Sequence, residues 1–231
     1  MKEIEVPAHI GFIMDGNGRW ATQRSKPRSY GHKMGLQNML DVCEHAFRLG
    51  VRIITVFALS AENMKRPEEE LNGLYDIFRS FFEKKKGKIR SENIRIRAIG
   101  DISVLPQDLQ DSIIETEQGT ADKKGGLLNV CINYGGRQDI LQAVNEAVAK
   151  GRFVDDTSFH DLLLTAGIPD PDLIIRTGRE VRISNFLLYQ AAYAEFYFSE
   201  KMWPAFRKRD LERALISYAE RDRRYGNIRK F

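Results

Sequence analysis

Short apolar runs alternate along the chain with longer segments in which apolar residues recur every three or four positions. The short runs are typical of strands buried on both faces, and the longer segments are typical of amphipathic helices. The pattern predicts strands at residues 10–14, 51–59, 94–99, 127–132, 173–175 and 195–198. It predicts helices at residues 36–47, 67–82, from 106 onward, at 139–150, after a cap at Thr157 or Ser158, and over 211–218.

Strands and helices that alternate with short connections predict one α/β domain over residues 1–231, with a mostly parallel central sheet flanked by helices. In such sheets, ligands bind at the carboxyl ends of the strands. Polar or cationic turns follow several of the predicted strands, at residues 15–19, 60–66, 176–178 and 182–184, with Glu195 as a further polar residue. We expect these turns to gather at one edge of the sheet and to form the functional site.

The turn after the first strand has the chemistry of a phosphate site. Asp15 ends the strand, a tight Gly-Asn-Gly turn with open backbone N–H groups follows, and Arg19 supplies a cation. Amides and a guanidinium bind phosphate oxygens, and a carboxylate holds a metal ion. Taken alone, the turn could equally be an ordinary surface turn. The number of converging turns, several with arginine, favours an enzyme that acts on a phosphorylated ligand.

Composition narrows the alternatives only in part. The 231 residues are 42% hydrophobic, which fits one sizeable domain, and the net charge of +4 suits a nucleic acid, an anionic membrane surface or a polyphosphate substrate equally well. Much of this excess falls late, between residues 207 and 230. Cys43 and Cys131 stand among apolar neighbours and are expected in the core of a protein from a reducing compartment. Because no apolar run is long enough to span a bilayer and no signal core is found, we expect a cytoplasmic protein.

The apolar stripe from Leu71 to Phe82 has two interpretations. Core packing is favoured, because amphipathic stripes usually face a core, and a lipid-facing wall is the alternative. The charged run at residues 84–88 is expected to be a solvated cluster.

Longer motifs occur in order along nearly the whole chain. They are HIGFIMDGNGRW at residues 9–20, GHK at 31–33, SAEN at 60–63, RP at 66–67, NYGG at 133–136, RTG at 176–178, RISNFLL at 182–188 and YAE at 193–195. In this combination the chain resembles the cis-prenyltransferases, and among them the bacterial undecaprenyl diphosphate synthases. The Asp-Asp-x-x-Asp signature of the trans enzymes is absent, since Asp155-Asp156 is followed by Thr-Ser-Phe.

The resemblance implies a homodimeric enzyme with an apolar tunnel for the growing chain. It implies Mg²⁺-dependent condensation of isopentenyl diphosphate onto an allylic diphosphate such as farnesyl diphosphate, with each new double bond cis. The product would be a polyprenyl diphosphate, the undecaprenyl carrier precursor of cell-wall synthesis, released with peripheral membrane contact. The small residue Ala58 favours a long product. The alternatives are a short- or medium-chain synthase, and a non-catalytic subunit, which would be expected to lose Asp15 or residues 176–184. Nucleic-acid binding lacks any recognisable motif, and no nucleic-acid partner is expected.

The resemblance also assigns roles to individual residues. Asp15 matches a Mg²⁺ ligand, and Glu195 matches a metal-associated position contributed across the dimer. Positions of the allylic diphosphate site are Gly16, Asn17, Gly18, Arg19, Arg28 and His32. Positions of the isopentenyl diphosphate site are Arg176, Arg182 and Ser184. Further substrate-site positions are Trp20, Ser60, Ala61, Glu62, Met64, Arg66 and Ile183.

Asn63 matches the position of the proton acceptor. Because a carboxamide has no basic form near neutral pH, we expect Asn63 to orient a water or to hand the proton to the released diphosphate. The alternatives are that Asn63 is only a turn or capping residue, and that His32 is only a helix-start residue. Three residues depart from the family pattern: Met64 replaces the usual Trp, Arg179 the second Gly after Arg-Thr-Gly, and Val181 a frequent His.

Overall fold

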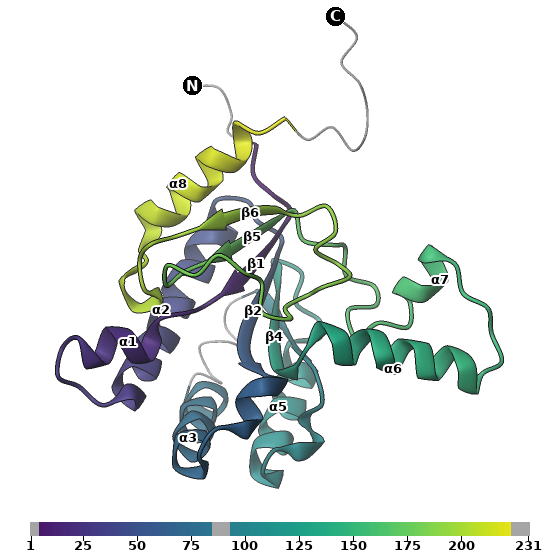
Figure 1. Ribbon diagram of the computed structural model, residues 1–231, viewed down its shortest axis with the longest axis horizontal. Helices are drawn as coiled ribbons and strands as arrows, with labels where there is room; N and C mark the ends of the chain where they lie inside the picture. Colours follow the sequence, from purple (N-terminus) through teal and green to yellow (C-terminus); the bar gives the residue numbers. More distant parts are fainter. Residues whose placement is uncertain (1–4, 85–92, 223–231) are drawn as a thin grey trace, which may run out of the picture.

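A computed structural model describes residues 5–84 and 93–222 of the chain. Its strands form a single sheet in the order β3-β4-β2-β1-β5-β6, and all neighbouring pairs are parallel (Figure 1). The strands are β1 (His9–Ile13), β2 (Ile53–Ser60), β3 (Ile94–Ile99), β4 (Gly126–Tyr134), β5 (Leu173–Arg176) and β6 (Glu195–Phe198). The predicted parallel α/β sheet is therefore confirmed.

Helices cover the sheet and extend beyond it. They are α1 (Asn17–Thr22), α2 (Arg28–Arg48), α3 (Glu68–Lys84), α5 (Gln107–Thr120), α6 (Gly136–Ala149), α7 (Asp156–His160) and α8 (Lys208–Ala219). Short 3-10 helices occur at η1 (Ala61–Lys65), η2 (Ile102–Val104) and η3 (Trp203–Ala205). Helix α3 packs between α2 and α5, whereas α6 and α7 lie on the opposite side of the molecule in Figure 1.

The strands are buried on both faces, as their unbroken apolar runs predict. In β1 all five residues are buried, and successive side chains enter different clusters. Ile10 and Phe12 join the larger core beneath α2 and α3, whereas Ile13 joins a second cluster with Phe186 on the other face. This alternation is the period of two expected for a strand.

The apolar stripe of α3 packs mainly into the core, and Leu74 also reaches the wall of a cavity. Tyr75, Phe78, Phe81 and Phe82 are all buried within the larger cluster, together with Leu74. The two cysteines are also buried and free, as predicted. None of the helices within residues 5–84 and 93–222 combines the length and the apolar composition of a membrane span. The charged run at 84–88 and the basic residues from 223 onward fall outside the described side chains.

The sequence pattern missed one helix and misplaced the starts of two others. Helix α1 was not predicted, and α2 begins at Arg28 instead of residue 36. The polar first turns of α2 carry few apolar residues, so the apolar period cannot reveal them. The cap of α7 is Asp155, two or three residues before the predicted caps. Its carboxylate accepts from the backbone N–H of Ser158 in a capping box.

The prediction that Glu195 lies at the same sheet edge as the other polar turns was also wrong. Strand β6 begins at Glu195, which pairs in register with Leu173 at the start of β5. Because the strands are parallel, Glu195 sits at the amino edge of the sheet. Within its own chain, its carboxylate accepts a 2.5 Å hydrogen bond from Arg221.

Candidate active site

A cavity of about 730 Å³ opens at the carboxyl ends of β1, β2 and β5. Most of the predicted site residues line it: Asp15, Gly16, Asn17, Gly18, Arg19, Arg28, His32, Ser60, Glu62, Asn63, Arg66, Arg176, Arg182 and Ser184. Its apolar wall consists of Ile13, Met14, Phe57, Ala58, Leu74 and Leu188. The cavity therefore joins a polar, cationic region to an apolar one.

Five predicted site residues lie outside this lining in the described chain, namely Trp20, Ala61, Met64, Ile183 and Glu195. Trp20 stacks on Tyr30, with the ring centroids 6.1 Å apart. Met64 packs against the larger core, and Ile183 packs against the second cluster. Met64 and Ile183 therefore pack into the cores beside the segments that carry the cavity lining.

The glycine turn after β1 leads directly into α1. Gly16 caps the helix with φ of 103°, a left-handed conformation that glycine adopts readily. The N–H of Trp20 bonds to the Gly16 carbonyl. The amides before Trp20 therefore belong to the first turn, where N–H groups have no partner within a helix. The predicted open amides are thus the start of a helix.

Close packing holds α1 against α2. A Cβ atom on Gly31 would lie 2.0 Å from the Asn17 backbone oxygen, and one on Gly35 would lie 2.3 Å from Asn17 Oδ1. Gly31 therefore leaves room for the Asn17 backbone, and Gly35 leaves room for its side chain. Its Nδ2 donates to Met14 O at 3.3 Å, whereas Oδ1 is buried without a hydrogen-bond partner among the described residues.

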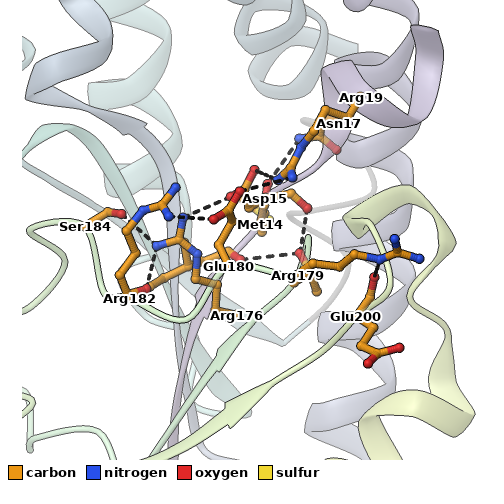
Figure 2. A network of polar contacts seen from close by, with 12 residues as sticks. Met14, Asp15, Asn17, Arg19, Arg176, Arg179, Glu180, Arg182, Ser184 and Glu200 are labelled. Carbon is orange, nitrogen blue, oxygen red and sulfur yellow. Dashed lines mark hydrogen bonds and ion pairs between the residues drawn. The ribbon is translucent and has the colours of Figure 1, made fainter. Parts of the chain in front are cut away.

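Asp15 lies between two arginines at the centre of the site (Figure 2). Its Oδ1 is 3.0 Å from Arg19 Nη2, and its Oδ2 is 2.9 Å from Arg176 Nη2. Arg176 is only 4% exposed, and its Nη1 donates to the Arg182 carbonyl and to Ser184 Oγ. Arg176 thus ties the end of β1 to the loop that follows β5.

A second cationic cluster surrounds Glu70 at the start of α3. Glu70 Oε1 lies 3.0 Å from Arg66 Nη1, 3.4 Å from Arg28 Nη2 and 4.0 Å from His32 Nε2. Burial and the charges of Arg66 and Arg28 lower the pKa of His32 to about 4, although Glu70 opposes this shift. His32 is therefore neutral at neutral pH, and its buried Nε2 has no hydrogen-bond partner among the described residues.

The segment after β2 presents Glu62 and Asn63 to the cavity. Ser60 Oγ accepts the backbone N–H of Asn63 at 3.3 Å and so caps η1. The capping role therefore belongs to Ser60, and the Asn63 side chain lines the cavity.

Four polar residues of the site were not among the predicted site residues. Glu70, at the start of α3, pairs with Arg28 and Arg66. Glu180 bridges Arg19 and Arg182, with a 3.1 Å contact to Arg19 Nη1. Arg137 and Asn185 line the cavity. Their positions in the sequence could have indicated them. Arg137 directly follows the NYGG motif, Asn185 lies inside the RISNFLL motif, and Glu180 lies between the last two cationic turns.

The departures from the family pattern lie at the margin of the site. Arg179 turns away from Asp15, and its Nε donates to the Glu200 carbonyl at 3.3 Å (Figure 2). The Val181 side chain is 74% exposed. Like Met64, neither lines the cavity of the described chain.

The chain is similar to known proteins over nearly its whole length. A family model described as putative undecaprenyl diphosphate synthase matches residues 13–226. An isoprenyl transferase of Lactococcus lactis is 42% identical, with 99% of this chain and 96% of the relative covered. One of Clostridium tetani is 41% identical, with 96% and 90% covered.

Solved structures give the same result. Lavandulyl diphosphate synthase from Lavandula x intermedia, in complex with dimethylallyl diphosphate, has a TM-score of 0.90 and 35% identity, with 96% of this chain and 99% of that chain covered. A probable undecaprenyl diphosphate synthase from Campylobacter jejuni has a TM-score of 0.82 and 30% identity, with 96% and 100% covered. The chain therefore belongs to the undecaprenyl diphosphate synthase family of cis-prenyltransferases, and it is an enzyme.

Proposed function

We propose that this enzyme condenses isopentenyl diphosphate onto an allylic diphosphate and makes each new double bond cis. The observation that carries the proposal is one cavity with two groups of cations and an apolar wall. Arg28 and Arg66 gather around Glu70, whereas Arg176 and Arg182 lie beside Ser184. Two cationic groups suit two diphosphates, and the apolar wall suits a hydrocarbon chain.

The reaction breaks an allylic carbon–oxygen bond, forms a carbon–carbon bond and removes a proton. The turn at Gly16 to Arg19, with Arg28 and His32, would bind the allylic diphosphate and neutralise the charge that develops as it leaves. Arg182 and Ser184 would orient isopentenyl diphosphate, with Arg176 between them and Asp15. Asn63 would orient a water, or hand the proton to the departing diphosphate.

Mg²⁺ is the proposed cofactor. Within the described residues, no group of three or more His, Cys, Asp or Glu side chains forms a closed metal site. Mg²⁺ fits here nonetheless, because it is typically held by one or two carboxylates together with substrate phosphates and water. Asp15 supplies such a carboxylate at the cavity wall. When bound, the metal would add positive charge against the leaving diphosphate.

Glu195 would reach a site only in a dimer, as the second metal-associated carboxylate. It lies at the amino edge of the sheet and outside the cavity of its own chain, so the contribution would be made to a partner subunit. Mixing Asp15→Ala and Glu195→Ala chains tests this, because each mixed dimer would contain one site with both carboxylates. Recovery of activity on mixing supports the shared site, whereas no recovery in a dimer shown to exchange subunits contradicts it.

Farnesyl diphosphate is the proposed starter, and an undecaprenyl chain for cell-wall synthesis is the proposed product. Ala58 leaves space in the apolar wall, which favours a long chain. A short product is the second candidate, since a solved relative of 35% identity is named lavandulyl diphosphate synthase. The intact Asp15 and Arg176–Ser184 region argues against a non-catalytic subunit.

A radiolabel assay tests the proposal. Labelled isopentenyl diphosphate would be incubated with farnesyl diphosphate, with and without Mg²⁺, and the products separated by length and double-bond geometry. A Mg²⁺-dependent cis ladder that ends near the undecaprenyl length would support the full proposal. A short cis product would support the proposed reaction and contradict the proposed undecaprenyl length. No incorporation by folded protein with several allylic starters would overturn the function.

A further inference from the structure

Asn185 lies where three segments of the cavity wall meet. It follows Arg182 and Ser184 in the loop after β5. Its backbone oxygen accepts from Gly136 N–H at 2.7 Å, and its side-chain Oδ1 accepts from Arg137 N–H at 2.8 Å. Gly136 and Arg137 open α6, and the first amides of a helix need partners from outside it. Asn185 therefore anchors the loop to the start of α6.

The other end of the same amide reaches the segment after β2. Asn185 Nδ2 donates to Glu62 Oε1 at 2.7 Å and to Gln138 Oε1 at 3.1 Å. An asparagine amide has two hydrogens to donate, and both are used here. With Oδ1 bonded to Arg137 N–H, every part of the amide has a partner, so only one orientation of the side chain satisfies all three of its contacts.

The backbone around Asn185 is held in an uncommon conformation. Ser184, Asn185 and Leu187 have φ values of 49°, 65° and 43°. Non-glycine residues rarely adopt this left-handed region, which asparagine tolerates better than most. A Cβ atom on Gly135 would lie 2.5 Å from Asn185 Nδ2, so glycine at this position leaves room for the contact. The surrounding structure is thus built around the Asn185 side chain.

Glu62 is a strong acceptor for this contact. Partial burial opposes its ionisation, but hydrogen bonds from its own backbone, from Asn185 and from Ser60 outweigh that effect and hold the pKa of Glu62 below its ordinary value. An ionised carboxylate forms a stronger hydrogen bond with an amide than a neutral one. The charge of Lys65 also favours the ionised form of Glu62, and Arg137 and Arg182 line the same cavity.

We propose that Asn185 is a positioning residue that sets the separation between the Arg182–Ser184 loop and the Ser60–Asn63 segment, and that it acts through Glu62. Both segments line the cavity, and one would hold isopentenyl diphosphate while the other would handle the proton. The expected effect of Asn185 on turnover rests on the proposed function. The cross-link that Asn185 forms between Glu62 and the start of α6 does not, so the two can fail separately.

Two variants isolate the side chain. Asn185→Gly removes the amide while its backbone still reaches a positive φ without strain. Asn185→Asp keeps the shape but replaces the donor by an oxygen that faces the Glu62 carboxylate. Asn145→Asp, on an exposed position of α6, is the matched control. We expect Asn185→Gly to lower kcat by roughly 10- to 100-fold through misalignment, with KM for isopentenyl diphosphate nearly unchanged because Arg176 and Arg182 remain.

The pH profile separates positioning from a folding defect. In Asn185→Asp, two adjacent carboxylates cannot both ionise freely, so the pKa of one of them rises. Below that pKa the pair shares a proton and the cross-link is restored. The ratio of variant to wild-type kcat is therefore expected to increase as the pH falls from about 8 to about 6. A ratio that does not change with pH, or an Asn145→Asp ratio that changes equally, overturns the proposal.

Hydrogen–deuterium exchange without substrate tests the cross-link itself. Asn185→Gly is expected to speed amide exchange both in residues 134–140 and in residues 60–66, with other segments unchanged. Unchanged exchange in 60–66 overturns the proposal, as does wild-type kcat in Asn185→Gly. If the wild-type protein shows no turnover but exchange responds as expected, the proposed function fails while the cross-link stands.

Discussion

Asp15 Oδ2 lies 2.9 Å from Arg176 Nη2, so a carboxylate at the end of β1 neutralises an almost fully buried cation at the end of β5. Removing one partner of a buried pair leaves an uncompensated charge, which is more costly than the pair is favourable. Asp15 therefore stabilises the site as well as serving the proposed chemistry.

Asp15→Ala is expected to abolish turnover and to lower the free energy of unfolding. We expect a loss of about 2–3 kcal/mol, below the value for fully buried pairs because Asp15 is partly exposed. Urea unfolding measures the stability, and the radiolabel assay measures the turnover. Asp76→Ala is the control, since the exposed pair of Asp76 with Arg79 is expected to contribute less than about 1 kcal/mol. Equal stabilities for the two variants would contradict the role given to Asp15.

His32 is expected to make the fold sensitive to acid. Its pKa is about 4 in the folded protein, against an ordinary value near 6.5, so the unfolded chain binds the proton more readily. The stability associated with neutral His32 is complete above about pH 6.5 and declines as the pH falls toward about 4. Unfolding measured at several pH values should show a shallower acid decline in His32→Gln.

Direct titration of His32 gives a second measurement. Nuclear magnetic resonance of its ring protons should show no midpoint between pH 6 and 7 in the free protein. Inorganic diphosphate should raise the midpoint, because an anion beside the ring favours the protonated form. A midpoint that diphosphate does not move would remove His32 from the anion site.

Arg179→Gly is expected to leave activity unchanged and to preserve or increase stability. Arg179 has φ of 68°, a conformation that glycine adopts at lower cost, so a gain of up to about 1 kcal/mol is expected. The side chain points away from Asp15 and bonds only weakly to Glu200 O. Ser25→Gly, at φ of 53° in a distant turn, controls for the effect on stability of placing glycine at a positive φ. A tenfold loss of turnover in Arg179→Gly alone would place Arg179 in the site after all.

Ala58→Leu is expected to shorten the product. Ala58 lines the apolar wall with Leu74, and added volume there leaves less space for a growing chain. The product distribution from the radiolabel assay should move to shorter chains, while the rate of the first condensation changes little. Ala121→Leu, at an exposed position, controls for an added side chain. An unchanged distribution of product lengths in Ala58→Leu would show that the growing chain does not run along Ala58.

The strands were predictable because each is an apolar run buried on both faces. Helix α1 was not, since Gly-Asn-Gly reads locally as a turn, and the helix depends on the close approach of Asn17 to Gly31 and Gly35 in α2. That contact joins Asn17, within the turn, to glycines that lie well beyond it in the sequence. The local sequence does not show which glycine another segment will contact.

The predicted site residues gathered largely as expected because parallel strands end at one edge. Glu195 is the exception, because it begins its strand and therefore lies at the opposite edge of the sheet. The composition of an apolar run does not show which of its ends faces the site. Glu70 and Glu180 were missed for a related reason. Their importance comes from the arginines that they meet in space, which the sequence does not place beside them.

Five of the six arginines that line the cavity of the described chain are already paired with the protein's own carboxylates. Arg19 and Arg176 hold Asp15, Arg28 and Arg66 hold Glu70, and Arg182 holds Glu180. An entering diphosphate would therefore exchange partners, and each exchange would release a carboxylate. Because Asp15 released in this way is the carboxylate proposed for Mg²⁺, diphosphate and metal would each raise the other's affinity by the same factor. The affinity for Mg²⁺ would therefore be low in the empty cavity and high once the diphosphate substrate is bound.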